Sequence, residues 1–182
     1  MRLFLAIDPD PAVVAVLAAM QAELHARLPA RRWSDPACLH LTLHFLGEVD
    51  AGRVPALAEL LAGVAARTLA FKLSVDGLGA FPSDAAPRVV WAGVGGDRDA
   101  LAALHGALAD GLVALGFSPD TRPYHPHLTL AREAAGPLPA IAPAPAAWIA
   151  RELVLYQSHL GGQTGQGSRY EAIARAPLTA PP

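Results

Sequence analysis

The sequence predicts an α+β protein, in which strands and helices follow one another without a regular alternation. Three features predict this class: segments in which apolar and polar side chains alternate, three segments with apolar residues at helical spacing, and a repeated tetrapeptide. The tetrapeptide is His-Leu-Thr-Leu, which starts at His40 and again at His127. A chain of 182 residues is long enough to bury a sizeable core, so we expect a single domain over residues 1–182.

The first half of the chain shows the spacing of four elements. They are, in order, a strand at 2–7, a helix at 11–28, a strand at 39–46 and a helix at 54–64. Asp10 and Pro11 are a suitable N-cap and first residue for the first helix, which Pro29 ends. Residues 33–36 predict a loop, and Gly47 is expected to end the second strand.

The second half of the chain shows the spacing of six further elements. They are strands at 71–78 and 88–94, a helix at 101–115, and strands at 124–131, 153–159 and 169–174. Gly77 and Gly79 are expected to break the first of these strands, and Gly116 to stop the helix. The proline-rich segment 136–147 predicts an extended surface connection, and the glycine-rich segment 161–167 predicts a hairpin turn.

The composition limits the class of protein. A net charge of −2 argues against broad electrostatic binding of nucleic acid. The single cysteine, Cys38, cannot form an internal disulfide and is typical of a reducing compartment. No apolar run reaches the length of a membrane span, and the run at 3–7 is too short for a signal peptide. We therefore expect a cytoplasmic protein that does not enter the membrane.

The repeated tetrapeptide carries the strongest chemical signal. Successive side chains of a strand point to opposite faces, so the histidine and threonine of each copy share one face while the two leucines share the other. We expect the leucines, and also Phe45, to lie in the core. If the two strands lie side by side, His40, Thr42, His127 and Thr129 meet in one space. Two imidazoles and two hydroxyls provide an acid, a base and two donors for an oxyanion, which is sufficient for phosphoester chemistry without a metal.

Further residues near the two copies are candidates for binding a substrate. They are Arg132, Arg122, Tyr124, His125 and His44. Either arginine has the chemistry to bind a phosphate, and Tyr124 has a ring that can stack on a base. His44 and His125 continue the polar face of the two motif strands by simple alternation.

Three other interpretations of the motif remain. The polar faces could simply meet water, or the four histidines could hold a metal ion. No Asp or Glu lies in either motif strand to complete a metal site, so we expect no metal. Cys38 lies two residues before His40 and could form a Cys-His nucleophile, although a small thiol at the rim is the simpler interpretation.

The paired motifs resemble those of the 2H phosphoesterase superfamily. The surrounding segments resemble its RNA 2′,3′-cyclic phosphodiesterase branch, which is also called the 2′-5′ RNA ligase-like family. The similar segments run in matching order from residue 1 to about residue 175, namely 2–8, 39–49, 77–82, 87–94 and 122–132. One departure is His44, where this family often carries a lysine.

The resemblance implies a bilobal α+β fold with pseudo-two-fold symmetry, in which two antiparallel sheets flank a central cleft and the helices lie outside. It implies hydrolysis of 2′,3′-cyclic phosphate ends to 2′-phosphates without a cofactor, and in some members a reversible 2′-5′ ligation of tRNA halves. By analogy, His40 is the general acid for the leaving 3′-oxygen, His127 is the general base, and Thr42 and Thr129 bind the phosphate.

The expected substrate is an RNA with a 2′,3′-cyclic phosphate end, or a small cyclic nucleotide. We expect a monomer without an obligate protein partner. Two alternatives stay open at this point: a non-catalytic protein that binds RNA ends, and a metal-dependent phosphoesterase that uses the histidine cluster.

Overall fold

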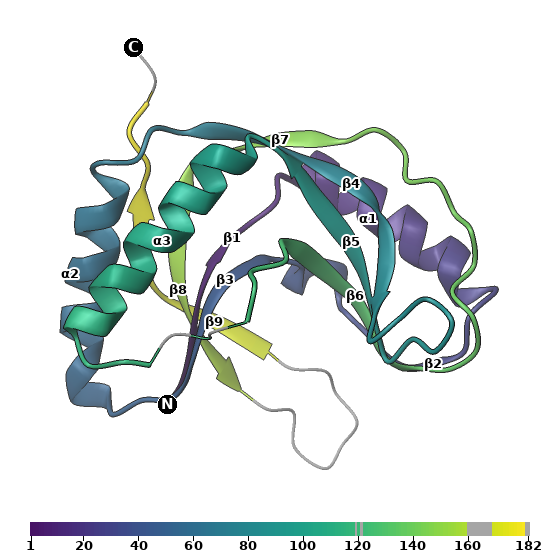
Figure 1. Cartoon of the computed structure of the whole chain (residues 1–182), viewed down its shortest axis with the longest axis horizontal. Coiled ribbons are helices and arrows are strands. Elements are labelled where there is room, and N and C mark those ends of the chain that lie inside the picture. The colour runs from purple at the N-terminus through teal and green to yellow at the C-terminus, as the bar shows by residue number, and fades with distance from the viewer. Residues whose placement is uncertain (119, 121, 160–168, 181–182) are drawn as a thin grey trace.

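The computed structural model describes residues 1–118, 120, 122–159 and 169–180. It confirms the α+β class: three α-helices pack on a curled antiparallel sheet in this part of the chain (Figure 1). The strands are β1 (Arg2–Ile7), β2 (Ala30–Trp33), β3 (Leu41–Glu48), β4 (Phe71–Phe81), β5 (Val89–Gly96), β6 (His127–Ala134), β7 (Ala147–Ala150), β8 (Glu152–His159) and β9 (Arg169–Pro177). The helices are α1 (Pro11–His25), α2 (Val54–Ala65) and α3 (Arg98–Ala114).

The sheet consists of two halves with the motif strands at their inner edges. One half has the order β7-β4-β5-β6, with β2 also paired to β6, and the other has the order β3-β1-β8-β9. Between β6 and β3, the register contains one facing pair, Leu41 with Leu128, within the described residues. The two sheets that we expected are therefore two halves of one sheet. They are joined at the centre by the single residue pair between β3 and β6.

The helices cross between these halves. β1 belongs to the half with β3, but the helix that follows it, α1, lies behind β4, β5 and β6 (Figure 1). Its buried Gln21 donates a hydrogen bond to the carbonyl of Leu130 in β6. Conversely, α3 follows β5 but packs with α2 on the other half, against β3 and β8. None of the helices in the described ranges is long and apolar enough to span a membrane.

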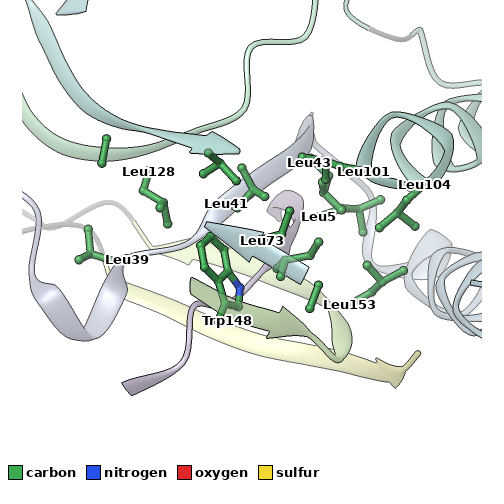
Figure 2. Packing of buried hydrophobic residues seen from close by; sticks show 14 of the residues in the cluster. Leu5, Leu39, Leu41, Leu43, Leu73, Leu101, Leu104, Leu128, Trp148 and Leu153 are labelled. Atoms are coloured by element: carbon green, nitrogen blue, oxygen red, sulfur yellow. The ribbon is translucent and has the colours of Figure 1, made fainter. Parts of the chain in front are cut away.

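Buried leucines connect the motifs to the helices. Leu41 and Leu128 are both 0% exposed, and Figure 2 shows them in the same core as Leu43, Leu101 and Leu104. The prediction that the leucines of both motifs face the core is confirmed. Their burial holds the motif strands against the helices, because each buried leucine side chain contributes about 1.5–3 kcal/mol.

Several predicted boundaries were wrong. The expected loop at 33–36 begins after a short strand, β2, and another short strand, β7, follows the proline-rich connection. Four-residue strands are too short to show alternation. β3 continues through Gly47 to Glu48. The expected turn at 161–167 lies outside the described residues.

Two glycines expected to break β4 instead shape it. Gly77 has a φ of +77° at an irregularity in the pairing of β4 with β5, a conformation that favours glycine. Gly79 faces Trp91, and a Cβ there would lie 2.3 Å from the indole ring. Gly79 therefore allows the Trp91 ring to lie over β4 while the strand continues.

Candidate active site

The facing pair Leu41 and Leu128 fixes the arrangement of the two motifs. His40 and Thr42 flank Leu41, and His127 and Thr129 flank Leu128, so the single facing pair brings the two His-x-Thr segments together. The two leucines are buried in the core, and the four polar side chains lie on the other face, half-buried. The structure thus brings together the four residues that the motif predicts. His40 immediately precedes β3, whereas His127 is the first residue of β6.

Each histidine ring is oriented by a carbonyl two residues earlier. Nδ1 of His40 lies 2.8 Å from the carbonyl oxygen of Cys38, and Nδ1 of His127 lies 2.6 Å from that of His125. A carbonyl only accepts, so each Nδ1 carries the proton and donates it. Nε2 is then the ring atom that can accept or release a proton on the cleft side.

The electrostatic surroundings of the two rings differ. Burial lowers the pKa of His40, its bond to Cys38 and the carboxylate of Asp8 raise it, and the charges of Arg132 and His127 lower it. Burial also lowers the pKa of His127, its bond to His125 raises it, and the charges of His125 and Arg132 lower it. The charged neighbours of His40 include a carboxylate as well as cations, whereas those of His127 are cationic. Asp8 thus favours the charged form of His40, while burial is the largest effect on both rings and disfavours their charged forms.

A β-bulge follows the threonine in both motifs. Ala6 faces Thr42 and Leu5 faces His44, so Leu43 is an extra residue in β3. In the same way, Trp91 faces Thr129 and Val90 faces Ala131, so Leu130 is an extra residue in β6. A bulge shifts the alternation by one residue. The second residue beyond each bulge, Phe45 in one motif and Arg132 in the other, consequently lies on the cleft face.

The bulge overturns two predictions about β3. Simple alternation placed His44 on the cleft face and Phe45 in the core. His44 is instead only 7% exposed and stacks on His105 of α3, with ring centroids 4.0 Å apart. Phe45 is 69% exposed and lies beside Phe4, which also contacts His40. When the two motifs are aligned by their histidines, Phe45 occupies the position of the polar Arg132. This alignment was a signal in the sequence that Phe45 is exposed.

The remaining candidates divide into three groups. Arg132 is exposed on the cleft face, close enough to affect the pKa of both His40 and His127. His125 is at the rim, with its ring 4.6 Å from that of Trp91. Tyr124 and Arg122 are not brought to the cleft: the Tyr124 hydroxyl donates to the backbone of β3, and the exposed Arg122 pairs with Asp120.

Aromatic side chains that the motif analysis missed surround the two histidines. Phe4, Tyr156 and Tyr170 lie around His40, and Phe81 and Trp91 lie around His127. A pocket of about 350 Å³ adjoins His40 and includes Tyr156, Asp8 and Arg175. Tyr156 donates hydrogen bonds of 3.0 and 2.8 Å to the two carboxylate oxygens of Asp8. These residues lie far apart in the sequence, so their spacing gave no local signal.

The histidines do not form a metal centre by themselves. Among the described residues, no three His, Cys, Asp or Glu side chains are grouped closely enough to hold a metal ion. The thiol of Cys38 is also a poor nucleophile, because burial and the nearby charge of Asp35 raise its pKa. The arrangement instead provides two proton-transfer groups, two hydroxyl donors and one guanidinium.

Comparison with known proteins gives consistent results. The model of the family described as LigT like Phosphoesterase matches residues 7–91 and 94–164. An RNA 2′,3′-cyclic phosphodiesterase of Geobacillus stearothermophilus is 34% identical over 98% of this chain, which spans 58% of that relative's length. The RNA 2′,3′-cyclic phosphodiesterase of Escherichia coli K12 is 36% identical and is covered over 97% of its length. The crystal structure of E. coli LigT complexed with 3′-AMP has a TM-score of 0.79 at 30% identity, with 98% of both chains covered.

Proposed function

This chain belongs to the LigT-like phosphoesterase family, and we propose that it hydrolyses 2′,3′-cyclic phosphate ends of RNA or nucleosides to 2′-phosphates. One observation carries the proposal: the pairing of Leu41 with Leu128 brings the two histidines and two threonines of the motifs together on the face opposite the buried leucines. The relatives named above are RNA 2′,3′-cyclic phosphodiesterases, and one binds 3′-AMP, which supports a nucleotide-sized substrate.

In the proposed reaction, water attacks phosphorus in line with the bond to the 3′-oxygen. Nε2 of His127 takes a proton from the water, and protonated Nε2 of His40 donates a proton to the departing 3′-oxygen. A new P–O bond forms as the P–O3′ bond breaks, and the phosphate stays on the 2′-oxygen. Asp8 near His40 and the cations near His127 support this assignment of acid and base.

The other residues on this face bind the substrate in this proposal. The hydroxyls of Thr42 and Thr129 donate to non-bridging oxygens as negative charge develops, and Arg132 supports the same charge. The exposed ring of Phe45 provides a surface on which a base can stack. If a 5′-hydroxyl takes the place of water as the nucleophile, the same groups form a 2′-5′ P–O bond as the P–O3′ bond breaks, so 2′-5′ ligation is a secondary activity of the proposed site.

The sequence and the described geometry support the finer features of the proposal. We propose metal-independent chemistry, since acid, base and oxyanion donors are all supplied by side chains. The chain acts as one domain because both half-sheets share one hydrophobic cluster. A monomer in the cytoplasm without an obligate partner is the state that we propose from its composition.

The test is incubation of the purified protein with 2′,3′-cyclic AMP, with and without EDTA, followed by identification of the product. We expect 2′-AMP in equal amounts under both conditions. Tight binding without turnover would support an RNA-end binding protein instead. Turnover that EDTA abolishes would support a metal-dependent phosphoesterase.

A further inference from the structure

The extra residue of a β-bulge leaves backbone groups without partners in the ladder, and buried carbonyls need a donor. At the first bulge, the Tyr124 hydroxyl donates to the carbonyl of Thr42 over 3.0 Å, and the Tyr124 ring stacks on that of His105. At the second bulge, Nε2 of Gln21 donates to the carbonyl of Leu130 over 2.9 Å. Both bulges are therefore held by side chains from outside their own strands.

Buried polar side chains lie next to both bulges. Among the described residues, Gln21 and His44 are the polar side chains that are buried, at 6% and 7% exposure. His44 stacks on His105, and its Nε2 bonds the carbonyl of His105 over 2.9 Å, while His105 stacks in turn on Tyr124 at 4.0 Å. We call Tyr124, His105 and His44 the first clamp. Burying polar groups costs free energy unless they are bonded, so their concentration behind the bulges requires an explanation.

Gln21 forms the second clamp. Its Nε2 also donates to the carbonyl of Ser34 over 2.8 Å, and the backbone N–H of Ser34 donates to Leu130 over 2.9 Å. The second clamp thus joins α1, the end of β2 and the bulge of β6. The first clamp joins α3, β3 and the segment before β6. Each motif is consequently held by the helix behind its own half-sheet (Figure 1).

The clamps hold the motif strands in place where the pairing of β3 with β6 does not. β3 and β6 share one facing pair, so the ladder leaves the motif strands free to splay on either side of Leu41 and Leu128. The Tyr124–Thr42 bond is a second tie between them, since Tyr124 lies three residues before His127. Because the Tyr124 hydroxyl holds the backbone carbonyl of Thr42, it also fixes the direction of the Thr42 side chain, whose hydroxyl lies on the cleft face.

We propose that Tyr124 and Gln21 are positioning residues: each fixes the bulge of one motif and thereby holds that motif's threonine hydroxyl toward the bound phosphate. This inference rests on the proposed phosphoesterase function. Tyr124 thus acts from behind the sheet and does not stack on a substrate base. Neither residue touches the substrate.

The test is a crossed set of double variants assayed with 2′,3′-cyclic AMP. Tyr124→Phe keeps the ring stack but loses the hydroxyl, and Gln21→Met keeps the volume but loses the donor. Each should lower kcat about 10-fold with KM changed less than about 2-fold, the scale of one misplaced transition-state hydrogen bond. The effect of Tyr124→Phe should vanish in the Thr42→Val background but persist with Thr129→Val. Gln21→Met should show the reverse pattern.

A purely structural role predicts a different result. Thr68→Val removes a comparable bond, from the Thr68 hydroxyl to the carbonyl of Val64 at 2.9 Å, far from the motifs. It should lower the melting temperature without changing kcat. If Tyr124→Phe and Gln21→Met behave in the same way, or if their effects add equally in both threonine backgrounds, the proposal is overturned.

Amide hydrogen exchange provides a readout that does not depend on activity. Tyr124→Phe should raise exchange about 10-fold in segment 42–45 alone, and Gln21→Met in segment 129–132 alone. If the wild-type protein does not turn over 2′,3′-cyclic AMP, the proposed function is overturned. The amide exchange of the two variants would still decide whether Tyr124 and Gln21 hold the bulges. Unchanged exchange in both variants would overturn the clamps themselves.

Discussion

At the scale of single residues, the two histidines have the same orientation but different charged neighbours. Each Nδ1 is bound to the carbonyl two residues before it, which points Nε2 toward the cleft. Asp8 raises the pKa of His40 and Arg132 lowers it, whereas His125 and Arg132 both lower the pKa of His127. The ring proposed as the acid, His40, is thus the one with a carboxylate beside it.

His40→Ala and His127→Ala should each lower kcat by at least about 10²-fold, the usual effect of losing a proton-transfer group. Since burial lowers the pKa of both rings below 6.5, the bell-shaped profile of kcat/KM in the wild type should have its maximum below about pH 6.5. His127→Ala should lose the acidic limb and His40→Ala the alkaline limb. Steady-state kinetics between pH 4 and 9 check both expectations.

Asp8→Asn serves as a control for the assignment of roles. It removes a charge that raises the pKa of His40, so only the alkaline limb should move to lower pH. If His127→Ala loses the alkaline limb instead, the roles of the two histidines are exchanged. An unchanged bell in both alanine variants contradicts the two-histidine mechanism.

Thr42→Val and Thr129→Val keep the shape and the strand propensity of the side chain but remove its donor. Loss of one donor to the developing charge should lower kcat by about 10- to 10³-fold. Single-turnover rates with 2′,3′-cyclic AMP measure this directly. A valine variant with the wild-type rate would exclude that threonine from binding the charged oxygens.

Phe45→Ala should raise KM for 2′,3′-cyclic AMP about 5- to 100-fold and change kcat little. The reason is that base stacking contributes roughly 1–3 kcal/mol per base and is retained in both ground and transition states. Phe45→Trp keeps an aromatic surface and should retain the wild-type KM. An unchanged KM in Phe45→Ala would show that the exposed ring does not contact the base.

At the scale of elements, the two motif strands share a bulge at the same place in the motif. Each has an extra leucine, Leu43 or Leu130, directly after its threonine. The extra residue sends the next side chain, His44 or Ala131, toward the helices. The next side chain, Phe45 or Arg132, points to the cleft face again. The first motif therefore presents an aromatic ring there, and the second presents a guanidinium.

Close packing of β4 on the Trp91 ring makes Gly79 sensitive to substitution. Gly79→Ala should lower the free energy of unfolding by about 1–3 kcal/mol, because the added Cβ would lie 2.3 Å from the indole. Gly63→Ala in α2 is the matched control, since its Cβ would meet only Arg67 at 3.8 Å. The control should be stabilised by about 0.5–1 kcal/mol. Urea unfolding of both variants decides the comparison, and equal stabilities would contradict the packing argument.

At the scale of the whole molecule, neutral buried histidines connect folding to pH. Burial lowers the pKa of His40, His44 and His127, and burial and the charge of His44 lower the pKa of His105 to about 4. The unfolded chain binds protons near pH 6.5, while the folded protein resists them to lower pH. Stability is therefore fully present above about pH 6.5 and decreases as the pH falls toward 4.

Urea unfolding at a series of pH values should show this decrease, with proton uptake on unfolding between pH 6.5 and 4. His105→Phe keeps a stacked ring without a titrating group. It should reduce the proton uptake by as much as about one proton. A stability that is constant from pH 7 to pH 4.5 would contradict burial of neutral histidines.

The sequence by itself determined the class of fold, most of the long elements and the four motif residues. These features depend on local periodicity: alternation sets His and Thr on one face of a strand, and helical spacing marks the three helices. Two copies of one tetrapeptide also indicated that the strands meet. Each of these signals lies within a short segment of chain, so one sequence was enough to detect them.

Only the tertiary structure decided what lies beside those four residues. A bulge is defined against a partner strand, so no local pattern shows that Phe45 turns into the cleft and His44 out of it. The crossing of α1 and α3 between the half-sheets brings Gln21 to the bulge of β6 and His105 against His44, which follows the bulge of β3. Asp8 reaches His40 in the same way, through the pairing of β1 with β3. These contacts depend on how distant segments pack together, which local sequence does not encode.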